Sequence, residues 1–116
     1  MYQLTRILTN PLNTAQFLHQ SYLHEVYRTS VFNLVVHQLG TGNVDYGILE
    51  GLVEKGITHG RKARSAAHDM GMGTAAEAYL RNGMRQLEKL QLELKRGNIQ
   101  GLHMLITGIP QAIPFE

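Results

Sequence analysis

The sequence contains no cysteine, no tryptophan and only three prolines. Without cysteine the chain has no thiol nucleophile, no thiolate metal site, no iron–sulfur cluster and no disulfide, and a reducing compartment is favoured. No apolar run approaches the roughly 20 residues that cross a bilayer, and residues 1–12 lack the charged start, apolar stretch and cleavage site of a secretory signal. We therefore expect a cytoplasmic protein with no membrane segment.

The remaining composition is that of one globular domain, since 43% of the residues are hydrophobic and 17% are charged, with a net charge of +2. At this length folding buries roughly 65% of the surface that an unfolded chain exposes, so a single core needs neither a disulfide nor a structural metal. We expect one domain over residues 1–116, with residues 1–10 as an N-terminal arm. Two prolines constrain residues 110–116, which we expect to form an extended tail.

The first predicted helix spans residues 11–39. Asn10 is a good N-cap, and Pro11 suits the first helical position because its missing N–H would be unpaired there. The apolar residues recur at spacings of three and four, but from residue 31 onward they surround almost the whole helix, so this half must be enclosed by the fold or by a partner. A break into two helices at residues 29–30 and a strand formed by the β-branched valines are the alternatives.

Two further long helices and one short helix follow, each bounded by a glycine or a capping residue. The second, over about residues 45–70, carries its apolar residues on one half of its circumference and most charged residues on the other. Gly56 and Gly60 lie at the centre of the apolar half, so a neighbouring helix can approach more closely than the usual 8–10 Å, unless one of these glycines ends a shorter helix. The third helix spans residues 74–96 and the short fourth helix residues 99–106.

The third helix is the most regular of these segments, because leucines recur along one stripe and charged residues occupy the opposite side. Short glycine-rich turns between the segments place neighbouring helices antiparallel. The predicted fold is therefore all-α: an antiparallel helical bundle of three long helices plus a short C-terminal helix.

No catalytic or cofactor motif is supported by its context. None of the six histidines has a glutamate three positions earlier, as a diiron bundle requires. His24 begins a pattern like that of a zinc-protease helix, yet Arg28 stands where the second zinc ligand belongs. Residues 71–76 fit the glycine pattern of a dinucleotide-binding turn, but they follow a predicted helix rather than a strand. We expect no catalytic residue, no metal and no cofactor, and therefore no enzymatic activity.

The histidines are expected to have ordinary structural places. We predict His19, His24 and His68 on the surface and His59 at the edge of the core. A metal site assembled from histidines far apart in the sequence stays open as a third functional hypothesis.

Positive charge is concentrated in one part of the chain. Residues 61–96 contain eight Lys or Arg and four Asp or Glu, whereas residues 1–60 contain three and four. If the helix faces that carry the basic residues converge, they attract phosphate or an acidic protein surface; otherwise they form an ordinary solvated face. Aromatic residues do not alternate with the cations, so stacking of single-stranded bases is not indicated. The candidate residues for this binding are Arg61, Lys62, Arg64, Arg81, Arg85, Lys89 and Arg96.

The leading functional hypothesis is a non-catalytic protein–protein interaction module, working as a homo-oligomer or as a small subunit or adaptor of a larger assembly. It rests on a surplus of apolar residues that three helices of this size do not easily enclose. The alternative is a nucleic-acid-binding or nucleoprotein-associated protein that uses the basic helix face. The candidate interface residues are Val31, Phe32, Val35, Val36, Leu39, Gly56 and Gly60, with Ile113 and Phe115 in the tail.

Overall fold

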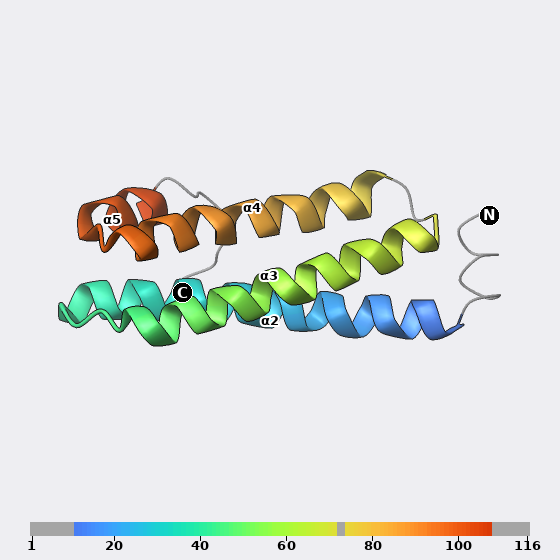
Figure 1. Ribbon diagram of the computed structural model, residues 1–116, viewed down its shortest axis with the longest axis horizontal. Helices are drawn as coiled ribbons and strands as arrows, with labels where there is room; N and C mark the ends of the chain where they lie inside the picture. The colour runs from blue at the N-terminus through green and yellow to red at the C-terminus, as the bar shows by residue number, and fades with distance from the viewer. Residues whose placement is uncertain (1–10, 72–73, 108–116) are drawn as a thin grey trace.

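The computed structural model describes residues 11–71 and 74–107, which form four helices and no strand. The three long helices run side by side in alternating directions, and the short last helix folds back at one end of the bundle (Figure 1). The predicted all-α bundle is confirmed, and because the first helix is uninterrupted, neither a break nor a strand forms at its centre. The predicted arm and tail lie outside the described residues. The helices are α2 (Pro11–Thr41), α3 (Tyr46–Asp69), α4 (Thr74–Arg96) and α5 (Ile99–Thr107).

The helix boundaries follow local capping chemistry. Asp45 is the N-cap of α3, and its side chain accepts a hydrogen bond from the backbone N–H of Ile48 at 3.1 Å. Asn98 does the same for α5, where its Oδ1 accepts from the backbone N–H three residues later at 3.1 Å. Gly97 follows α4 with a φ of +63°, a left-handed conformation that glycine adopts without the steric cost of a Cβ. Asn10, the predicted cap of α2, lies outside the described residues.

The main hydrophobic cluster draws residues from all four helices. From α2 it takes Val31, Phe32 and Val35, none of which is exposed to solvent. Because α3, α4 and α5 contribute to the same cluster, this half of α2 is covered on several sides, which explains why it is apolar almost all the way round. The other members are Leu49, Val53 and Ile57 of α3, Leu87, Leu90 and Leu94 of α4, and Leu102 of α5.

Glycines allow the long helices to approach closely at the middle of the bundle. A Cβ on Gly56 would lie 2.8 Å from Cδ1 of Leu87 in α4. A Cβ on Gly60 would lie 2.7 Å from Cγ of Met84 in α4 and 2.8 Å from Nδ1 of His24 in α2. Real Cβ atoms do not come this close to other atoms, so neither position has room for a side chain. The small-residue groove predicted on α3 therefore exists, and the helices that fill it are α2 and α4 of the same chain.

Candidate functional site

A buried polar cluster centred on His24 lies where α2 meets α3 and α4. His24 is only 1% exposed, so the prediction that it lies on the surface is wrong. Gly60 and Gly83 flank the imidazole, since a Cβ on Gly60 would lie 2.8 Å from Nδ1 and one on Gly83 would lie 2.6 Å from Nε2. Because neither glycine carries a side chain, α3 and α4 leave a slot that the ring fills.

The hydrogen bonding of His24 determines its protonation state. Nδ1 lies 2.8 Å from the carbonyl oxygen of Gly56, which can only accept, so Nδ1 carries the proton. Nε2 is buried and has no hydrogen-bond partner among the described residues. Burial lowers the pKa of His24 below the ordinary 6.5, although the hydrogen bond to Gly56 partly opposes this, and a charged ring would carry a second N–H that nothing accepts. His24 is therefore neutral at pH 7.

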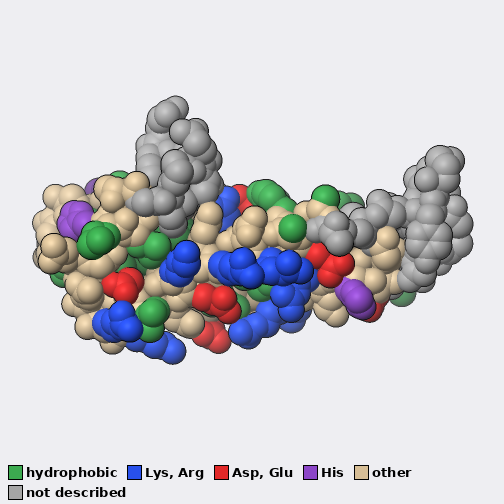
Figure 2. Space-filling model, turned by 90° about the horizontal axis from the view of Figure 1, so that it is seen from above, with side chains coloured by type: hydrophobic (Ala, Val, Ile, Leu, Met, Phe, Trp, Pro, Cys, Tyr) green, Lys and Arg blue, Asp and Glu red, His purple; other side chains and the backbone are tan. Residues whose placement is uncertain are grey.

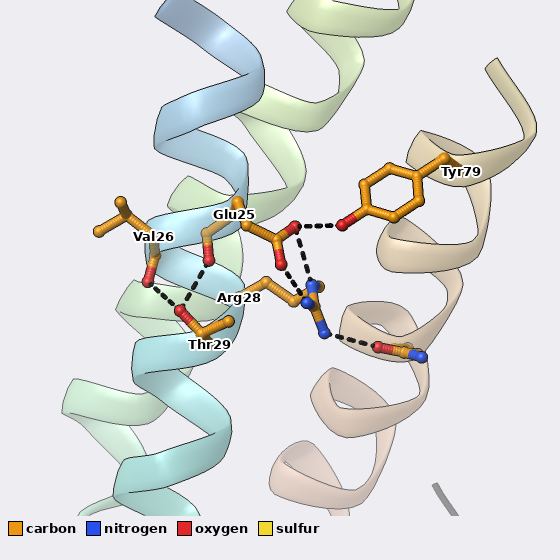
Figure 3. A network of polar contacts seen from close by, with 6 residues as sticks. Glu25, Val26, Arg28, Thr29 and Tyr79 are labelled. Atoms are coloured by element: carbon orange, nitrogen blue, oxygen red, sulfur yellow. Dashed lines mark hydrogen bonds and ion pairs between the residues drawn. The ribbon is translucent and has the colours of Figure 1, made fainter. Parts of the chain in front are cut away.

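Arg28, one turn after His24, joins α2 to α4 (Figure 3). It is 6% exposed, and its guanidinium pairs with Glu25 and donates from Nη1 to Oε1 of Gln86 at 3.1 Å. The hydroxyl of Tyr79 in α4 donates to Oε2 of Glu25 at 3.1 Å. A buried guanidinium is costly without such partners, so the helix spacing depends on this set of contacts being complete.

The charges of the cluster offset one another. Burial alone raises the pKa of Glu25, but the hydrogen bonds and the charge of Arg28 outweigh it, and the net pKa lies below the ordinary 4.5. Burial and the neighbouring Glu25 carboxylate raise the pKa of Tyr79, so its hydroxyl stays protonated and continues to donate. The carboxylate and the guanidinium are engaged with each other, and the cluster acts to hold α2 against α4.

The sequence contains a signal for this placement that the prediction did not use. His24, Arg28, Val31 and Val35 follow one another at spacings of four, three and four, which is the pattern of one stripe along a helix. Because the two valines belong to the core, the two polar residues on the same stripe are carried inward as well.

Most of the predicted interface residues lie inside the protein. Three are completely buried in the core of this chain, two are half-buried, and two are glycines covered by neighbouring helices. They therefore offer little open surface to a partner, because the chain uses them for its own packing. The completely buried residues are Val31, Phe32 and Val35, the half-buried residues are Val36 and Leu39, and the covered glycines are Gly56 and Gly60. The tail residues Ile113 and Phe115 lie outside the described residues.

The outer face of α2, which we define as Leu12, Leu18, Tyr22 and Val26, is apolar and open to solvent. Leu12 is 85% exposed, Leu18 61% and Tyr22 66%. The last three residues follow one another at intervals of four, so they form a stripe on the side of the helix away from the core. The only Lys, Arg, Asp or Glu among the 31 residues of α2 are Glu25, which is half-buried and paired with Arg28, and Arg28 itself, which is buried. The outer face therefore carries no formal charge.

Basic side chains of α3 and α4 gather into a band on one face of the molecule (Figure 2). Among them, Arg61 and Arg64 of α3 and Arg81 of α4 meet at an open cleft of about 450 Å³, and we call these three residues the basic cleft. None of their guanidinium groups lies within 4 Å of a carboxylate in the described part of the chain. Basic residues of α3 and α4 therefore do converge, which is the condition set above for the attraction of phosphate or an acidic protein surface. Among the described residues, the lining of the cleft is Arg61, Arg64, Ser65, His68, Glu77 and Arg81.

The other predicted basic residues lie outside this cleft. Arg85 and Lys89 are exposed on α4, one and two turns after Arg81. Arg96 lies in the last turn of α4, where it pairs with a glutamate of the same helix at 3.4 Å. Lys62 is exposed on α3 but does not line the cleft. The structure thus brings three of the seven predicted cations together.

The histidines do not form a metal centre in the described part of the chain, where no group of three or more His, Asp or Glu side chains is able to hold an ion. His19 and His68 are exposed, as predicted. His59 is half-buried; its ring stacks on Tyr27 with centroids 5.5 Å apart, and its Nδ1 hydrogen-bonds to Gln20. This is the edge-of-core position expected for His59, and the arrangement gives the metal hypothesis no support.

None of the described helices is long and apolar enough to span a membrane. Comparisons of the chain with protein-family models, with curated proteins and with solved structures find no match. A function must therefore be inferred from the arrangement of the residues in this chain.

Proposed function

We propose that the chain is a self-associating interaction module, in which the outer face of α2 packs against the same face of a second copy. The observation that carries the proposal is the exposed, apolar and uncharged outer face in the first half of this helix, from Leu12 to Val26. The centres of protein interfaces are depleted in charged residues and enriched in aromatic residues. Tyr22, with Leu18 and Val26 on the neighbouring turns, has this composition.

The charge distribution favours a second copy as the partner. A two-fold arrangement sets identical surfaces against each other, so a charged face repels its copy whereas an uncharged face does not. Among the three long helices, α2 alone has no fully exposed Lys, Arg, Asp or Glu in the residues that the structure describes. The basic cleft belongs to α3 and α4, so two copies joined through α2 do not bring these positive charges into the contact.

The dimensions of the outer face agree with a reversible dimer. The outer face runs from Leu12 to Val26, so it is about 22 Å long and about 11 Å wide. Two such faces in contact bury on the order of 500 Å² in total, which is below the roughly 1,200 Å² of a standard interface and is typical of weak, transient contacts. We therefore expect the dimer to form only at high protein concentration.

Sedimentation equilibrium over a wide range of protein concentrations tests this proposal. The wild-type chain is expected to shift from its 13.0 kDa monomer mass towards twice that mass as the concentration rises. The double variant Leu18→Glu/Tyr22→Glu should stay monomeric, because two like charges on each copy would then face one another. The control is Leu92→Glu, which places one such carboxylate on an exposed apolar position of α4 and should dimerise as the wild type does.

All three substituted side chains are exposed, so circular dichroism should show the same helix content in every variant. A wild-type chain that remains monomeric at every concentration would overturn the proposal, and this is also the behaviour expected of an adaptor that binds only a different protein. An oligomer that survives Leu18→Glu/Tyr22→Glu would show that another surface makes the contact.

A further inference from the structure

The basic cleft is separate from the outer face of α2. Arg61 and Arg64 are three positions apart on α3, so they lie on one side of that helix, and Arg81 reaches the same cleft from α4. All three residues are exposed, and in the described part of the chain no carboxylate lies within 4 Å of their guanidinium groups. Three guanidinium groups converge here with a single carboxylate in the described lining, which leaves a local positive potential that attracts anions.

The chemistry of the cleft suits phosphate. The guanidinium group presents several N–H donors in a planar fork that matches the oxygens of a phosphate. The described lining contains one carboxylate, Glu77, whose Oε1 lies 3.8 Å from Nδ1 of His68 rather than against an arginine. The arginines therefore keep their donors available for a ligand.

The surface beside the cleft favours a row of phosphates over a single ion. Arg85 and Lys89 follow Arg81 along α4 at intervals of four residues, which corresponds to a rise of about 6 Å for each step. A linear polyanion is able to contact the cleft and this row together, whereas a single phosphate reaches only one part of it. No Phe, Tyr or Trp belongs to the described lining, so nothing there stacks on unpaired bases, and a duplex fits better than a single strand.

We propose that the basic cleft binds the phosphate backbone of a nucleic-acid duplex without reading its sequence. Arg61, Arg64 and Arg81 each contact a phosphate, and the exposed cations of the next turns of α4 extend the contact. The cleft uses α3 and α4 whereas self-association uses α2, so duplex binding goes beyond the proposed function and does not depend on it.

Fluorescence anisotropy with a labelled DNA duplex of random sequence tests this inference. Three phosphate contacts contribute about −2.7 to the slope of log affinity against log salt, which weakens binding about 40-fold between about 50 and 200 mM salt. Arg64→Gln and Arg81→Gln should each reduce the size of this slope by about 0.9. Lys62→Gln is the matched control: it removes one charge from the same helix as Arg64 but does not alter the cleft, so the slope should stay unchanged.

The three substitutions lie on exposed side chains, so unchanged circular dichroism confirms that each variant is folded. The absence of binding at about 50 mM salt would overturn the inference, because electrostatic contacts are strongest there. An equal loss in Lys62→Gln and Arg64→Gln would also overturn it, since general surface charge would then explain the attraction. Displacement of the duplex by inorganic phosphate at an equal concentration of phosphate groups would show that the cleft prefers a free anion. The same measurements on Leu18→Glu/Tyr22→Glu should give the same arginine dependence, which separates this result from self-association.

Discussion

Gly83 provides a direct test of the packing around His24. In Gly83→Ala the new methyl carbon would lie 2.6 Å from Nε2 of His24 and 3.3 Å from Cδ of Arg28. The imidazole has no free space on its other side, because Gly60 lies there and Nδ1 is hydrogen-bonded to the Gly56 carbonyl. The methyl group must therefore separate α2 from α4 or break that hydrogen bond.

The expected magnitude combines two opposing effects. Replacing glycine by alanine inside a helix stabilises it by about 1 kcal/mol, because alanine loses less backbone entropy on folding. Adding a methyl group to a filled site costs about 1–3 kcal/mol. Gly51 is the matched control, since it is exposed on α3 and a Cβ there would meet nothing within 4 Å. We therefore expect Gly83→Ala to be less stable than Gly51→Ala by about 1–3 kcal/mol.

Urea unfolding followed by far-ultraviolet circular dichroism, at a pH where histidine is neutral, measures this difference. A second pair of variants isolates the cause: in a His24→Ala background the ring is absent, so Gly83→Ala should lose its cost and behave like Gly51→Ala. If Gly83→Ala alone raised the free energy of unfolding as much as Gly51→Ala does, then the ring would not fill the slot between Gly60 and Gly83, and the description of the cluster would be wrong.

Two further predictions concern protonation and capping. The pKa of His24 is lowered by folding from 6.5, so the unfolded state takes up a proton first and the free energy of unfolding should fall as the pH drops below about 6.5, by up to about 1.4 kcal/mol per pH unit. His24→Gln should remove most of this slope in urea titrations between about pH 5 and 6.5, where Glu25 stays ionised. A smaller slope should remain from His59, because burial and, after it, the charge of a nearby lysine also lower the pKa of that residue. An unchanged slope in His24→Gln would contradict the assignment to His24. Asp45→Ala should lower the free energy of unfolding by about 1 kcal/mol because Ile48 loses its N-cap acceptor, whereas Asp45→Asn should retain most of the stability; equal losses in both variants would indicate that the charge matters rather than the cap.

The helices and their ends could be predicted from the sequence because the signals for them are local. Asp45 and Asn98 accept hydrogen bonds from backbone N–H groups three residues after them. Gly97 adopts a left-handed conformation directly after α4, as glycine commonly does at the end of a helix. The close approach at Gly60 could also be inferred, because a small residue at the centre of an apolar face leaves room for a neighbour. The positions of the basic residues on their own helices follow from spacing alone.

The neighbour that covers each surface was decided only by the tertiary structure. The enclosed half of α2 required a cover, but its sequence is compatible with a partner as well as with α3, α4 and α5, and the fold places the residues around Phe32 in the chain's own core. The slot for His24 exists because Gly60 of α3 and Gly83 of α4, 23 positions apart, lie on either side of the ring. Likewise, Arg61 and Arg81 share a cleft only through the register of α3 against α4. Caps and periodicity depend on backbone energies over a few residues, whereas burial and convergence depend on packing between segments far apart in the chain, which local sequence does not specify.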